Sequence, residues 1–368
     1  MGRGTNTIIA IAVMFVVIIL MALFFGLFAP ITGGPGNPNI FNSLTLNSTS
    51  SVPNNQATTT AQSTAQTQLN YSYLVNYTLE LINQDRAAFG AAPVSLSQEP
   101  SGQQHAGSML QYNYFSHWDI YGMKPYMRYT ALGGTESVDE NIATLSSREC
   151  SYIGHAIAGQ SACTGALNVT KSISNMEYSM MYNDSACCNN GHRENILDPN
   201  HNQVRIGIAY NSSTIYLVED FIDSYVSWFQ KSPGYSNGEV TLAGRITPGK
   251  PISTILVAYD PPVSNMSRST LDGTGPYGYG TNIAGVAKGR LEYYPDLQTI
   301  YADSYQVNGN QFYISFNISS LVSQYGAGEY TMGLWLNGSS SSGGGSFVAA
   351  TYTVFINSDK QQYQPQGI

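Results

Sequence analysis

An uncharged apolar run near the N-terminus constrains this chain more than any other feature. Residues Ile8 to Phe28 read IIAIAVMFVVIILMALFFGLF, and these 21 residues are enough for a helix to cross the hydrocarbon core of a bilayer. The following FAPITGG has no clear small-x-small cleavage site, which favours an uncleaved anchor over a signal peptide. Arg3 and the N-terminal amine place the N-terminus in the cytoplasm. We therefore expect residues 1–30 to be a signal anchor of a single-pass cell-membrane protein.

The rest of the chain is expected to lie outside the cell. N-x-[S/T] sequons, which are glycosylated only outside the cytoplasm, are frequent after the apolar run. The formal net charge of −8 and the absence of any Lys/Arg cluster argue against a nucleic-acid partner. The sequon asparagines are Asn47, Asn70, Asn76, Asn168, Asn183, Asn211, Asn265, Asn317 and Asn337. These features predict a glycoprotein whose partners are the membrane and an unidentified extracellular ligand or surface protein.

A linker and a first folded domain are predicted after the anchor. Residues 31–69 are rich in Ser, Thr, Asn, Gln and Pro, and such a segment buries too little apolar surface to offset its ordering entropy. We expect this linker to be disordered. Apolar side chains then recur at helical spacing near residues 71–90, 101–115 and 168–183, and RIGIAYNSSTIYLVEDF reads as a β-hairpin. Helices with a small antiparallel sheet predict an α+β fold, an α/β/α sandwich, over residues 70–232.

The C-terminal third has an all-β pattern. VTLAGRI, TILVAYD, GVAKGRLEYY, TIYADSYQV, QFYISFNI, YTMGLWL and FVAATYTVFI are short runs separated by turn residues, with one helical turn expected at 318–325. This spacing predicts an immunoglobulin-like β-sandwich over residues 236–358, followed by a loose tail at 359–368. The Gly-rich GTGPYGYG at 273–280 lacks a following Lys-Ser/Thr, so it predicts a loop and not a phosphate site.

Short motifs between Leu81 and Phe221 carry the most specific signal. In order they are INQDRAAFGAAPV, HAGSM, YFSH, DENIA, MYND, GHRENIL and IGIAY. Each is weak alone, but together their order and spacing resemble the CAP superfamily over residues 71–228. That family is named for cysteine-rich secretory proteins, antigen 5 and pathogenesis-related 1. The resemblance implies an extracellular domain in which two histidines and two acidic residues face a central cleft.

The resemblance also implies which residues line that cleft. His117 in YFSH and His192 in GHREN take the two histidine positions, and Glu140 in DEN takes the first acidic position. An aspartate replaces the family's glycine before Glu140, so the local turn there is expected to differ. The second acidic position maps to Asp184 in MYND, where Met replaces the family's Trp and Asp replaces its Glu. Glu177 is a rival, because it lies two helical turns earlier on the same face.

Two imidazoles and two carboxylates are a donor set for a divalent cation. Neutral imidazoles bind Zn or a similar metal, and carboxylates complete or orient such a site. The same residue types also form hydrogen-bonded clusters without metal, and residue types alone favour that interpretation. With the family order added, weak binding of Zn or another divalent cation becomes an equal alternative.

The remaining histidines and the cysteines are expected to have structural roles. His105 lies mid-helix and is predicted to be a core or semi-buried side chain, His155 to be exposed in an insert, and His201 to lie in a turn.

An even number of cysteines outside the cell suggests disulfides, and the four are Cys150, Cys163, Cys187 and Cys188. A bridge between the adjacent Cys187 and Cys188 would be strained, because their Cα atoms are only ~3.8 Å apart. We therefore expect the 150–163 insert to be crosslinked to the Cys187-Cys188 segment. The competing interpretation is a Cys150–Cys163 bridge with two free thiols. Adjacent thiolates lack the C-x-x-C spacing, so no cysteine metal site is expected.

Three functions remain open from the sequence. The first is a non-enzymatic surface binding module, for a ligand, lipid, glycan or protein, since the family resemblance implies no single shared reaction. The second is a metal-dependent hydrolase acting on cell-envelope material, with His117, His192 and Glu140 holding a metal or activating water. The third is an inert glycosylated envelope spacer. That absence of a single shared reaction favours the first by analogy. Separately, no nucleophile motif such as G-x-S-x-G is present.

Overall fold

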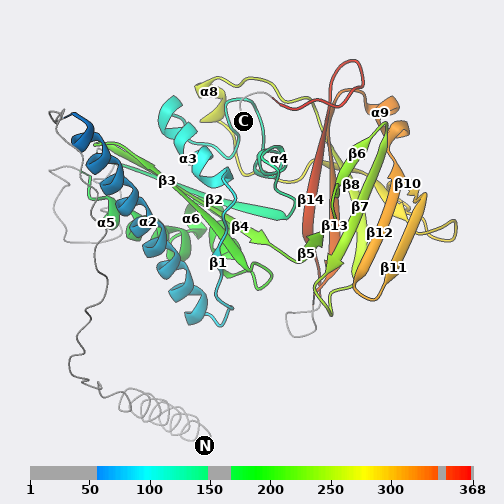
Figure 1. Cartoon of the computed structure of the whole chain (residues 1–368), viewed down its shortest axis with the longest axis horizontal. Coiled ribbons are helices and arrows are strands. Elements are labelled where there is room, and N and C mark those ends of the chain that lie inside the picture. Colours follow the sequence, from blue (N-terminus) through cyan, green and yellow to red (C-terminus); the bar gives the residue numbers. More distant parts are fainter. Residues whose placement is uncertain (1–55, 148–166, 339–344, 366–368) are drawn as a thin grey trace, which may run out of the picture. The chain divides into compact units, whose positions relative to one another are not determined.

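A computed structural model describes residues 56–147, 167–338 and 345–365, with side chains from Tyr71 onward (Figure 1). The described chain from Thr58 onward forms one compact unit. It contains a mixed α and β region followed by a β-rich region, as the sequence predicts.

The mixed region is built on a four-stranded sheet of order β1-β3-β4-β2. Its strands are β1 (Ser95–Leu96), β2 (Ser137–Ser146), β3 (Gln203–Tyr210) and β4 (Thr214–Asp223). β3 and β4 form the predicted hairpin, and β2 pairs antiparallel with the other side of β4. β2 is therefore an edge strand, and its outer row of main-chain groups is available to other parts of the chain.

Alternation along the strands divides the helices between the two faces of this sheet. Ile215 and Leu217 pack in one core with residues of α2, α5 and α7, whereas Tyr216 and Val218 pack in another core with residues of α3. Figure 1 shows α3 on one side of the strands and α2 on the other. The bounds of the helices are α2 (Gln56–Ala88), α3 (Ser101–Tyr112), α4 (Pro125–Ala131), α5 (Val169–Tyr182), α6 (Ser185–Cys188) and α7 (Gly191–Leu197). The sequence placed α3 and α5 correctly to within a few residues.

The linker prediction needs one correction, because α2 begins at Gln56, inside the segment predicted to be disordered. Residues 56–69 contain no Gly or Pro and include Ala and Gln, which favour helix, so the helix of the folded domain extends backward through them. The rest of the predicted linker, residues 31–55, lies outside the described residues.

The β-rich region consists of two five-stranded sheets that share one core. The first has the order β10-β9-β8-β13-β14, and in the second β11-β12-β7-β5 is joined by β6 against β7. The strands are β5 (Val226–Trp228), β6 (Gly234–Ser236), β7 (Glu239–Ile246), β8 (Ile252–Asp260), β9 (Thr281–Ala287), β10 (Gln298–Tyr301), β11 (Ser304–Asn308), β12 (Gln311–Asn317), β13 (Gly328–Asn337) and β14 (Ser346–Ile356). The expected helical turn is α9 (Ser319–Tyr325). Side chains of both sheets fill the core between them.

The join between the two regions lies earlier than the predicted boundary at 232–236. β5 already pairs with β7 of the β-rich region, so the chain leaves the first sheet directly after Asp223. The β8–β9 connection (residues 261–280), which carries the short helix α8 (Arg268–Leu271), reaches back to the mixed region. There Met266 donates its main-chain N–H to the carbonyl of Ile120 at 2.8 Å.

Within the residues that the structure describes, no helix combines the length and apolar character needed to cross a membrane. The predicted anchor, Ile8 to Phe28, lies outside those residues.

Candidate functional site

The edge strand β2 presents two adjacent polar residues to opposite faces of the sheet. The Glu140 side chain lies on the α3/α4 face, and the Asn141 side chain lies on the α5/α7 face, where its amide donates to the main-chain carbonyl of His192 at 3.1 Å. Two of the four residues implied by the family resemblance, Glu140 and His192, are thus held around one short stretch of β2.

Both carboxylate oxygens of Glu140 are engaged. Oε1 lies 2.9 Å from His117 Nδ1, and Oε2 lies 2.8 Å from His105 Nδ1. Arg128 donates to Oε2 at 2.6 Å and also to the main-chain carbonyl of His117 at 2.9 Å. The exposed fraction of Glu140 is 2%. A buried charge requires such partners, so this cluster fixes the imidazole of His117 as well as Glu140.

Opposing influences set the charge of this cluster. Burial acts to raise the pKa of Glu140, but His105 and Arg128 outweigh it and hold the pKa well below its usual range. Burial, with the nearby Arg128 charge, lowers the pKa of His105. Glu140 is therefore a permanent carboxylate that orients its neighbours, and it is a poor proton acceptor.

The second acid–histidine pair is built by a single short segment. Asp184 Oδ1 lies 2.6 Å from His192 Nδ1, and Oδ2 accepts the main-chain N–H groups of His192 and Arg193 at 2.9 and 3.2 Å. Asn189 and Asn190 both have positive φ (51° and 68°), a conformation that asparagine tolerates, and they turn the chain back so that α7 begins against Asp184. Asp184 thereby satisfies amides at the start of α7 while it orients His192.

The rival Glu177 has a different neighbour. It is buried in α5 and faces Glu219 of β4, and burial followed by the charge of Glu219 raises the pKa of Glu177 well above its usual value. Asn141 donates to Glu219 at 3.5 Å. Glu177 thus has Glu219 of β4 as its neighbour, whereas Asp184 Oδ1 lies 2.6 Å from His192 Nδ1, so Asp184 is the partner of His192.

The two predicted histidines share one arrangement. In each, Nδ1 contacts a buried carboxylate and the side chain is 16% exposed. A carboxylate on Nδ1 orients an imidazole so that Nε2 becomes the available donor, the usual arrangement in protein metal sites. The chemistry of the donors therefore fits the divalent cation implied by the family resemblance. The structure brings each histidine to its own carboxylate, and the two pairs approach β2 from different elements.

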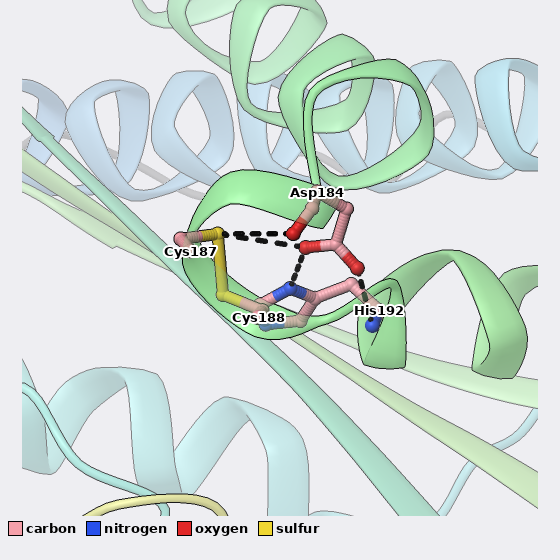
Figure 2. Close-up of side chains that lie close together, drawn as sticks. All are labelled: Asp184, Cys187, Cys188 and His192. Atoms are coloured by element: carbon pink, nitrogen blue, oxygen red, sulfur yellow. Dashed lines mark hydrogen bonds and ion pairs between the residues drawn. A yellow bond between two sulfur atoms is a disulfide. The ribbon is translucent and has the colours of Figure 1, made fainter.

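The cysteines differ from expectation. Cys187 and Cys188 are bridged to each other, and not to the 150–163 insert; Cys150 and Cys163 lie outside the described residues. The two cysteines are the last two residues of the one-turn helix α6, and the bridge joins their sulfurs beside His192 (Figure 2). Among described side chains, the ligand atoms of Asp184, Cys187, Cys188 and His192 all lie within 4.8 Å of one another. The absence of C-x-x-C spacing therefore does not keep these sulfurs away from other metal-ligating groups.

The β8–β9 connection covers the free edge of β2 beside His117. The main-chain N–H of Glu140 donates to the Tyr277 hydroxyl at 2.7 Å, and the Tyr277 ring lies 4.8 Å from the His117 ring, centre to centre. Ser116 and Thr274 share a hydroxyl hydrogen bond of 2.6 Å nearby. The Gly-rich run at 273–280 is a loop, as predicted, and its Tyr277 and Thr274 contact residues at and beside His117.

Two other histidine predictions have clear outcomes. His105 is buried, as expected, but it also belongs to the Glu140 cluster. His201 was expected only to lie in a turn, and its contacts were not predicted. The side chain is buried, its Nδ1 lies 2.8 Å from Asp223, and its ring stacks on Phe221. His155 lies outside the described residues. Sequence reasoning missed Arg128, which lies in none of the family motifs. It also missed Tyr277, whose Gly-rich run was interpreted only as a loop and which comes from the other region of the chain.

The structure thus pairs each of the two predicted histidines with one of the predicted acidic residues. Residues 79–226 match the CAP: Cysteine-rich secretory protein family. The match includes all four predicted site residues and ends where β5 joins the β-rich region. We refer to residues 79–226 as the CAP region.

A crystal structure of an extracellular protein containing a SCP domain from Bacillus anthracis str. Ames is similar, with 18% sequence identity and a TM-score of 0.27. The similarity covers 40% of this chain and 39% of that one, so the chain spans about two fifths of its length. No curated protein matches the chain.

Proposed function

We propose that this protein is a membrane-anchored, extracellular binding module whose CAP region holds a divalent cation weakly beside β2. The observation that supports this most directly is the matched pair of imidazoles, each with Nδ1 on a buried carboxylate. His117 and His192 would bind the metal through Nε2, and Glu140 and Asp184 would orient them. A bound cation supplies a positive site for an anionic or carbonyl group of an extracellular ligand.

Binding is favoured over hydrolysis by the state of the carboxylates. Glu140 makes contacts through both oxygens and its pKa is held low, so it does not act as a proton acceptor. Asp184 is likewise committed to His192 and to two main-chain amides. Tyr277 of the β8–β9 connection lies against the His117 ring, and it reduces the space available to a ligand beside that histidine.

The extracellular placement is part of the proposal. It rests on the apolar run at Ile8–Phe28 and on the sequons. Each sequon asparagine with a described side chain is exposed, as glycosylation requires. These residues are Asn76, Asn168, Asn183, Asn211, Asn265, Asn317 and Asn337.

Zinc titration by calorimetry on residues 58–368 tests the proposal. We expect saturable binding that is lost in the His117→Ala/His192→Ala double variant and kept in Glu194→Gln, which removes an exposed carboxylate two residues from His192. The absence of saturable binding in the unmodified protein would contradict the metal site. Zinc-dependent cleavage of cell-envelope polymer that is lost in the double variant would instead establish the hydrolase.

A further inference from the structure

A pair of reactive groups lies beside His192 and has no part in the proposed function. The Cys187–Cys188 cystine occupies the end of α6, with Cys187 exposed and Cys188 half-buried. Figure 2 shows the cystine, the Asp184 carboxylate and the His192 imidazole turned toward one another. Cys187 Sγ lies 3.6 Å from both the main-chain oxygen and Oδ1 of Asp184. An exposed cystine is accessible to a small reductant.

Reduction changes what this group can bind. A dithiol reductant attacks one sulfur as a thiolate, forms a mixed disulfide, and then closes its own cyclic disulfide. Two electrons and two protons pass to the protein, and Cys187 and Cys188 become thiols. The four residues then offer two sulfurs, one imidazole nitrogen and one carboxylate oxygen. Metal binding displaces the thiol protons, because thiolate is the form that ligates metal.

The positions of these atoms suit a single small cation. Ligands of a tetrahedral zinc ion lie ~2.0–2.3 Å from the metal and so roughly 3.3–3.8 Å from one another. The four ligand atoms already lie within 4.8 Å of one another, so adjustments of about 1 Å bring them to that geometry. One segment of nine residues, 184–192, carries all four, and the Asp184 contacts to the start of α7 hold it together. Thiolate donors select thiophilic cations.

We propose that the Cys187–Cys188 cystine is a redox-gated metal site: once reduced by a dithiol, the two thiolates, His192 and Asp184 bind a thiophilic divalent cation such as Zn²⁺ or Cd²⁺. The site shares His192 and Asp184 with the proposed function but does not depend on His117 or on metal binding in the oxidised protein. In an oxidising extracellular environment the cystine is the resting state. Metal capture through sulfur then follows exposure to reductant.

Cadmium titration of the full chain in detergent tests this, read by the thiolate-to-cadmium charge-transfer absorption in the ultraviolet. A Cys150→Ser/Cys163→Ser background leaves only the two thiols of interest. We expect one equivalent of Cd²⁺ and a charge-transfer band after dithiol reduction, and no band in the oxidised protein. In the same background Cys187→Ser/Cys188→Ser abolishes the band, His192→Ala weakens cadmium binding by about 10-fold or more, and Glu194→Gln changes neither.

Two results would overturn the inference: no band after reduction, or cadmium affinity unchanged by His192→Ala, which would mean that the thiolates bind alone. If the background variant does not fold, the unmodified chain and Cys187→Ser/Cys188→Ser are compared after reduction, and bands of equal strength would overturn it. Zinc titration of the oxidised protein reports separately on the proposed His117–His192 site, so failure of the proposed function and failure of this site are distinguished.

Discussion

The two acid–histidine pairs of the CAP region have the same chemistry but are built in different ways. The His117–Glu140 pair depends on tertiary contacts with Arg128 and His105, and on Tyr277 from the β-rich region. The His192–Asp184 pair is made by nine consecutive residues beside a cystine. The first pair is therefore coupled to the folding of the whole unit, and the second depends mainly on the local turn between α6 and α7. Each prediction below tests that difference.

The largest effect is expected from Arg128→Met. Arg128 is buried and bonds to Glu140, so its removal leaves the carboxylate without its cationic partner. Loss of one partner of a buried ion pair costs about 3–5 kcal/mol of unfolding free energy. Chemical denaturation measures this value. Arg193→Met is the matched control at the second pair, where the guanidinium stacks on Phe89. A loss of unfolding free energy as large as that of Arg128→Met would contradict the proposed difference between the two pairs.

Tyr277→Phe tests whether the β-rich region supports the first pair alone. The substitution removes the acceptor of the Glu140 main-chain N–H, and an unsatisfied buried donor costs about 1–3 kcal/mol. We expect zinc affinity to change as well, since the ring contacts His117. Chemical denaturation measures the unfolding free energy, and calorimetry on the same sample measures the zinc affinity. An unchanged unfolding free energy would show that Tyr277 does not stabilise the first pair.

Asp184→Ala tests the local pair. It removes the acceptor of two main-chain amides at the start of α7, a change that resembles loss of a helix cap and costs about 1–2 kcal/mol. Because the pair is local, we expect amide hydrogen exchange to accelerate in residues 185–197 and not in β2. Faster exchange across β2 would show that the two pairs are coupled.

The smallest effect is a difference in pH dependence. Burial, followed by the charge of Glu219, raises the pKa of Glu177, and Asp85 acts in the same direction. In this pH range the folded state therefore binds more protons at Glu177 than the unfolded state does. The stability that the protonated Glu177 carboxyl contributes is fully present below the pKa of the unfolded carboxyl, and it is lost as pH rises. As pH rises from about 5 to about 8 we expect the free energy of unfolding to fall, and to fall less steeply in Glu177→Gln. The pKa of Asp220 is also raised, so both proteins keep a common slope. Denaturation at several pH values measures the difference, and parallel profiles would refute the assignment.

Much of this arrangement follows from the sequence because it depends on local patterns. Helical periodicity located α3 and α5, the Asn-Ser-Ser break located the β3–β4 hairpin, and the motif order located His117 and His192. The choice between Asp184 and Glu177 required the sheet order, since only tertiary structure places Glu219 opposite Glu177. The contact between Tyr277 and Glu140 could not be predicted from motifs, because the two residues are separated by more than a hundred positions. The Cys187–Cys188 bridge was rejected on covalent geometry, yet the structure has it.

The central claim is that His117 and His192 act together on one cation. The most direct test is anomalous X-ray diffraction at the zinc edge from crystals of oxidised residues 58–368 grown with zinc. The account predicts a zinc peak bound by Nε2 of both histidines beside β2, and no peak there in crystals of His117→Ala/His192→Ala. A peak that contacts only one of the two histidines, or no peak at saturating zinc, would contradict it.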